Sequence, residues 1–95
     1  MGLSLKLQEA QRLLEKLGWE RAGDAKDIIW LYRAPDRRPV LWTKLSKGRG
    51  DMKGNVADKF RSQLKLTEDE LRQALAGAIG AEEYQEIIRR KGWLR

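Results

Sequence analysis

The chain has 95 residues, which is enough for one domain and too short for two. It carries 20 Lys and Arg against 14 Asp and Glu, and the resulting net charge of +6 favours an acidic partner such as a nucleic acid. The absence of Cys and His excludes disulfides and thiolate metal sites, and we expect no cofactor and no bound metal. No apolar run reaches the roughly 20 residues that span a bilayer, and the chain does not open on a signal-like region. We therefore expect a cytoplasmic protein with no membrane partner. A charged fraction of 36 % is typical of heat-loving sources.

The N-terminal part predicts one helix followed by strands. Apolar residues recur at helical spacing over residues 4–17, with Ser4 as the expected N-cap and Gly18 as the expected stop. Three strands are predicted after it, at residues 19–22, 28–32 and 40–45. Two prolines in the turn at residues 34–39 return the last strand antiparallel to the one before it, which gives a three-stranded meander.

The C-terminal part predicts a loop and then three helices. Residues 46–54 contain three glycines without an apolar period, so we expect a loop. Asn55 is the expected cap of a second helix on which Val56, Phe60 and Leu64 share one side. A capping box at residues 67–70 opens a third helix, and residues 81–91 form a last one that Gly92 ends.

These elements predict an α+β fold in a single domain, residues 1–95. The order α-β-β-β-α is that of double-stranded-RNA-binding domains, in which helices cover one face of an antiparallel sheet. Residues 1–65 form the core of this prediction, and two short helices in residues 66–95 extend it.

Basic residues gather in one part of the chain. Residues 33–65 hold ten Lys and Arg against three Asp, a net of +7 that exceeds the charge of the whole chain. A glycine-rich basic loop that leads into the start of a helix is suited to binding a phosphate backbone. The alternative interpretation of these charges is a solvated protein face. The spacing of Gly48, Gly50 and Gly54 fits no nucleotide-binding loop. We expect Trp19, Trp30 and Trp42, one on each strand, to pack in the core or on the sheet rather than to stack on bases.

Four short motifs, in this order and spacing, resemble the longer members of the HicA toxin family. They are LLEKLGW at residues 13–19, TKLSKG at 43–48, QLKLT at 63–67, and the segment from Glu83-Tyr84 to Lys91-Gly92. The resemblance covers nearly the whole chain. It implies a small ribonuclease with a double-stranded-RNA-binding fold that cuts mRNA and is held inactive by a HicB-like antitoxin.

The chain departs from this family at the catalytic positions. The family's S-H-G histidine falls on Lys47, and a second histidine that often follows an Asp falls on Ile28, after Asp27. Histidine serves RNA cleavage because its pKa lies near 7, whereas a lysine begins protonated. The resemblance thus leaves Lys47 as a candidate for stabilising the transition-state charge and Asp27 as a candidate base, or as a plain surface aspartate.

Two functions follow from these residues. The protein is either a toxin-type ribonuclease or a catalytically inactive relative that binds RNA or an antitoxin-like protein. DNA binding and a structural role are the lesser alternatives. The sequence leaves the oligomeric state open. The residues that we expect at RNA are Arg33, Lys44, Ser46, Lys47, Arg49, Lys53 and Lys59.

Overall fold

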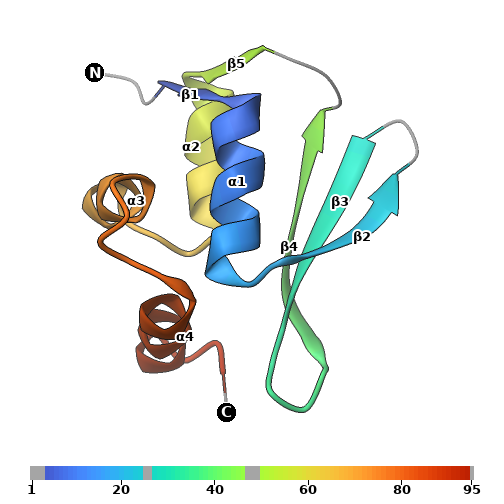
Figure 1. Ribbon diagram of the computed structural model, residues 1–95, viewed down its shortest axis with the longest axis vertical. Coiled ribbons are helices and arrows are strands. Elements are labelled where there is room, and N and C mark those ends of the chain that lie inside the picture. Colours follow the sequence, from blue (N-terminus) through green and yellow to red (C-terminus); the bar gives the residue numbers. More distant parts are fainter. Residues whose placement is uncertain (1–3, 25–26, 47–49, 95) are drawn as a thin grey trace.

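The computed structural model describes residues 4–24, 27–46 and 50–94 and shows an α+β fold (Figure 1). Three antiparallel strands form the main sheet in the order β2-β3-β4, and within the described residues four helices lie on one side of it. This confirms the predicted α+β class and the three-stranded meander. The strands are β2 (Glu20–Asp24), β3 (Asp27–Arg33) and β4 (Pro39–Ser46), and the helices are α1 (Leu7–Leu17), α2 (Asn55–Gln63), α3 (Glu68–Leu75) and α4 (Ala81–Arg90).

The two faces of the main sheet differ because successive side chains of a strand point to opposite sides. Ile28, Trp30 and Tyr32 of β3 are buried, and so are their register partners Leu45, Thr43 and Leu41 of β4. The residues between them, such as Ile29 and Trp42, are exposed. The helices therefore cover one face of the sheet and leave the other face open.

A second, two-stranded sheet corrects the prediction at two places. Ser4–Lys6, predicted as the first turn of α1, forms strand β1, and Asp51–Lys53, predicted as loop, forms strand β5. The two strands pair antiparallel, with Leu5 opposite Met52, and both of these side chains are buried. Apolar burial against a distant segment outweighs the local helix and loop signals here.

The helix ends are only partly as predicted. Helix α1 begins at Leu7, and α2 takes Gly54 rather than Asn55 as its N-cap. The capping box at Thr67 is confirmed, because its side chain accepts from the backbone N–H of Glu70 and its own N–H donates to the Glu70 carboxylate. Gly18 ends α1 in the left-handed region at φ 95°.

One hydrophobic cluster joins the sheet to all four helices. Trp19 and Trp30 are buried in it, at 4 % and 3 % exposure, which confirms the prediction for these two tryptophans. Residues of the C-terminal extension, including Leu71, Tyr84 and Ile88, belong to the same cluster. Within the part of the chain that the structure describes, no helix is long and apolar enough to cross a membrane.

Candidate nucleic-acid interface

An open cleft of about 490 Å³ lies between strand β4 and helix α2. Helix α2 stands behind α1 in the view of Figure 1, beside the sheet. We call this hollow the β4–α2 cleft. Its lining combines an exposed indole, two lysines, one carboxylate and several apolar side chains: Asp27, Trp42, Lys44, Met52, Val56, Lys59, Phe60 and Gln63.

Trp42 is the largest exposed apolar side chain at this cleft. Its strand alternates strictly, with Leu41, Thr43 and Leu45 turned to the core, so Trp42 and Lys44 face outward. Trp42 is 57 % exposed, so of the two placements predicted for it, in the core or on the sheet, the core placement is wrong. The alternation of leucines at positions 41 and 45 is the sequence signal that could have indicated this exposure.

Lysines from two elements flank the indole. Lys44 comes from β4, and Lys59 is an exposed residue of α2 that lines the same cleft. The Lys44 Nζ lies 3.8 Å from a carboxylate oxygen of Asp27, which is the first residue of β3. Both partners of this pair are partly exposed, so it contributes at most about 1 kcal/mol of stability. The cations therefore remain accessible to an anionic ligand that displaces water.

Gln63 closes the cleft at the C-terminal end of α2. It accepts a hydrogen bond of 2.5 Å from the Thr43 hydroxyl, and Thr43 is fully buried. This bond fixes α2 against β4 and holds the amide group at the edge of the cleft. Gln63 opens the QLKLT motif of residues 63–67, but nothing in the sequence indicated that its side chain lies at the cleft.

The residues predicted from the sequence to cleave or contact RNA, apart from Arg33, divide into three groups. Asp27, Lys44 and Lys59 meet at the β4–α2 cleft. Ser46 ends β4 and Lys53 ends β5, and only their backbones are described. Lys47 and Arg49 lie outside the described residues.

Arg33 lies at the other end of the sheet, among compensating charges. Its Nε donates to the Glu20 carboxylate at 2.7 Å, and its Nη1 donates to the Arg37 carbonyl oxygen. Arg37 also lies near Glu20, and Arg38 near Asp36. The basic segment that the sequence shows as one cluster thus contains a paired group at the β3–β4 turn, the lysines of the cleft, and Arg61 and Lys65 at other hollows.

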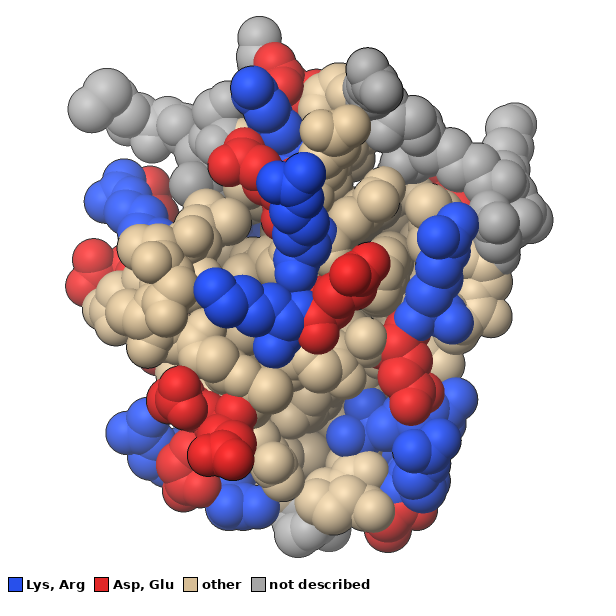
Figure 2. All heavy atoms as spheres, in the orientation of Figure 1, with Lys and Arg blue, Asp and Glu red and all other residues tan. Residues whose placement is uncertain are grey.

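The face that carries α1 has a different character. Figure 2 shows basic and acidic side chains interspersed over this face. A hollow between α1 and α3 is lined by Glu9, Arg12 and Lys16 among other residues, so acidic and basic side chains occur together there too. A mixed surface of this kind is a poor match for a polyanion.

In comparisons with known proteins, no family model, no curated protein and no solved structure matched the chain.

Proposed function

We propose that this protein is a HicA-like domain that binds RNA at the β4–α2 cleft. The observation that carries the proposal is the exposed Trp42 beside Lys44 and Lys59 at one open hollow. An aromatic face stacks on an unpaired base, and lysines attract the phosphates next to it. The basic excess of the chain and the sheet with helices on one face support the same function.

Binding without cleavage is the activity that the described residues support best. Cleavage through the 2′-hydroxyl needs a group that exchanges a proton near neutral pH, and the chain has no histidine. Asp27 reaches the cleft, but it lies beside the Lys44 ammonium. The Asp27 carboxylate is therefore already paired with a cation of the cleft.

A ribonuclease is the second candidate, favoured by the position of Asp27 at the cleft. Incubation of an end-labelled mRNA with wild-type protein and with Asp27→Asn tests it. Cleavage by the wild type that the variant lacks would establish this second candidate. Intact RNA with both proteins, at concentrations that saturate binding, supports a binding domain. A gene for a HicB-like partner next to this one would support the toxin–antitoxin setting, which rests on the motif order.

The binding proposal is tested by anisotropy of a labelled single-stranded RNA at two salt concentrations. We expect Lys59→Ala to weaken binding and to lower the salt slope by roughly 0.7, the value for one phosphate contact on a single strand. Trp42→Ala should weaken binding with the salt slope unchanged. Arg12→Ala, which removes the same charge from α1, is the matched control. Equal losses in Arg12→Ala and Lys59→Ala would show attraction to net charge alone and contradict a site at the cleft.

A further inference from the structure

A second hollow adjoins the β4–α2 cleft on the side of the C-terminal extension. It measures about 220 Å³ and is lined by Val40, Leu41, Trp42, Gln63, Lys65 and Trp93. Trp42 and Gln63 line both hollows, so these two residues form the boundary that the hollows share. Two exposed indoles, one from β4 and one from the end of the chain, therefore border the same depression.

Trp93 is held at the surface by its neighbours on both sides. Gly92, at φ 88°, turns the chain after α4, and the N–H of Trp93 donates to the Ile88 carbonyl oxygen at 3.1 Å. Leu94 is buried, whereas the Trp93 side chain is 43 % exposed. Because the Trp93 backbone is fixed, only the side-chain torsions of the ring are left to be ordered when a planar ligand stacks on it.

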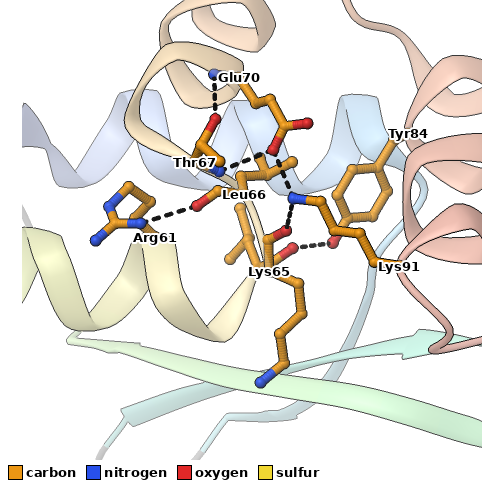
Figure 3. A network of polar contacts seen from close by, with 8 residues as sticks. Arg61, Lys65, Leu66, Thr67, Glu70, Tyr84 and Lys91 are labelled. Carbon is orange, nitrogen blue, oxygen red and sulfur yellow. Dashed lines mark hydrogen bonds and ion pairs between the residues drawn. The ribbon is translucent and has the colours of Figure 1, made fainter.

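Lys65 connects this indole to the cleft. Its Nζ lies 4.3 Å from the centre of the Trp93 ring, within the range of a cation–π contact. Figure 3 shows its side chain leaving the polar network of the α2–α3 joint in the direction of β4. The Lys65 carbonyl oxygen accepts from Lys91 Nζ at 2.6 Å, which ties this residue to α4. The Lys65 ammonium therefore lies over the Trp93 ring, at a depression that Trp42 also borders.

Cations continue beyond Trp93. A third hollow, which shares Lys65 and Trp93 with the second, is also lined by Arg61 and by Lys91, whose ammonium is paired with the Glu70 carboxylate. Along the three hollows, indoles and basic side chains thus alternate over β4, α2 and the C-terminal end. Exposed aromatic rings between cations are the features by which proteins hold single-stranded nucleic acid.

We propose that Trp93 is a second base-stacking residue, so that the ligand is a single-stranded RNA that runs from the β4–α2 cleft over Gln63 to the C-terminal extension. This inference rests on the proposed function and names its substrate class. A duplex keeps its bases stacked inside, where indoles at a protein surface do not reach them. A single strand offers one base to each indole while its phosphates meet Lys59 and Lys65.

The test compares three ligands: an oligouridylate of about ten nucleotides, within the site sizes of small single-strand-binding domains, an RNA duplex of that length, and polyphosphate, which has charge without bases. The variants are Trp93→Leu, which keeps apolar bulk, and Trp93→Phe, which keeps an aromatic ring. Leu75→Ala, at an exposed apolar residue of α3 outside the three hollows, is the control.

We expect Trp93→Leu to weaken oligouridylate binding by about five-fold or more, as for the loss of one stacked base, and to leave polyphosphate binding unchanged. Trp93→Phe and Leu75→Ala should bind oligouridylate within about two-fold of the wild type, because a ring remains or the site is untouched. The duplex should bind more weakly than the single strand. Because Leu and Phe both preserve apolar packing, a difference between them is a difference in stacking.

Other results overturn the inference in distinguishable ways. Unchanged binding in Trp93→Leu together with a loss in Trp42→Ala would remove Trp93 from the site and leave the proposed function standing. No RNA binding by the wild type would remove the proposed function itself. Equal loss for polyphosphate and RNA, or a duplex that binds as tightly as the single strand, would contradict stacking. A wild-type dimer that Trp93→Leu dissociates in sedimentation would assign this indole to contact with a second copy.

Discussion

Tyr84 attaches the C-terminal helix to the rest of the molecule through both its ring and its hydroxyl. The side chain is fully buried, and its ring lies edge-on to Tyr32 with 5.1 Å between the ring centres. Its hydroxyl donates to the Leu64 carbonyl oxygen at 2.8 Å, at the end of α2. A buried carbonyl oxygen at a helix end needs such a donor, so the hydroxyl and the ring act together.

Replacement of this hydroxyl is the prediction at the scale of the residue. Tyr84→Phe should lower the free energy of unfolding by about 1 kcal/mol, because the ring still packs while the Leu64 carbonyl oxygen loses its donor. Urea denaturation at neutral pH measures this. A variant as stable as the wild type would show that water replaces the hydroxyl at no cost.

The burial of Tyr84 also predicts how the stability of the protein changes at alkaline pH. Burial raises the pKa of Tyr84 well above its ordinary value of 10.0, and burial also raises the pKa of Tyr32. At high pH the folded state still holds the Tyr84 proton, whereas the unfolded state releases it. The contribution of this group to the free energy of unfolding is therefore complete below about pH 10 and falls as the pH rises above it. Between about pH 10 and pH 11 the wild type should lose stability more steeply than Tyr84→Phe, by up to about 1.4 kcal/mol per pH unit. Parallel curves would contradict this assignment.

At the scale of the element, the joint between α2 and α3 is held by α4. Lys65 has a left-handed backbone, at φ 61°, which allows the chain to turn sharply between the two helices. The Lys91 Nζ donates both to the Lys65 carbonyl oxygen and to the Glu70 carboxylate, each at 2.6 Å (Figure 3). Arg61 donates to the Leu66 carbonyl oxygen at 3.0 Å. The otherwise free carbonyl groups of the turn therefore find donors on neighbouring helices.

Glu70→Gln removes the negative charge that pairs with Lys91 but keeps a side chain that can cap α3, so it tests the two roles separately. Burial acts to raise the pKa of Glu70, but the hydrogen bonds from Lys91 and Thr67 and the Lys91 charge together hold that pKa below its usual 4.5. The stability from this ionised group is therefore present above about pH 4.5 and is lost as the pH falls through the lower, folded-state pKa. Gln keeps an acceptor for the Thr67 N–H, and the Lys91–Glu70 pair is partly exposed. We therefore expect Glu70→Gln to lower the free energy of unfolding by less than about 1 kcal/mol at neutral pH.

The acid dependence gives the measurement for this prediction. The difference in unfolding free energy between Glu70→Gln and the wild type should shrink as the pH is lowered to about 3, where the wild-type carboxylate also loses its charge. Glu83→Gln is the matched control, because Glu83 accepts from the Gly80 N–H at the start of α4 in the same way. An equal pH-dependent loss in the control would point to charge at a helix start rather than to the Lys91 pair.

At the scale of the whole molecule, the C-terminal extension is part of the core. Leu71 and Ile88 are fully buried, as is Tyr84, and all three belong to the cluster that contains Leu14 and Leu17 of α1. Figure 1 places α3 and α4 against the helices that cover the sheet. The extension that provides Trp93 is therefore also needed to bury α1.

Removal of residues 67–95 should abolish cooperative folding. Burial of three large side chains contributes about 5 to 9 kcal/mol, which is comparable to the total stability of a small domain. Circular dichroism during thermal unfolding should show a sharp transition for the full chain and none for the shortened one. A shortened chain that melts cooperatively would show that the extension is an addition to a domain that folds without it.

The sequence by itself determined the parts of this protein that depend on neighbouring residues. Apolar spacing is a local property, so it indicated the helices and the three strands of the meander, and the Thr67 capping box was evident because its partners are three residues apart. Charge type likewise singled out Lys44 and Lys59, whereas Asp27 was singled out by the family resemblance. The strands β1 and β5 were missed because each has three residues and is stable only against the other.

Only the tertiary structure decided which of these residues share a surface. The alternation of Leu41 and Leu45 indicates which side of β4 is apolar, but only the packing of the helices on that side leaves Trp42 exposed at a cleft. The fold also brings Trp93, from the end of the chain, to the same depression as Trp42 and separates Arg33 from the other predicted residues. Contacts between distant segments depend on how the core is packed, and no local pattern carries that information.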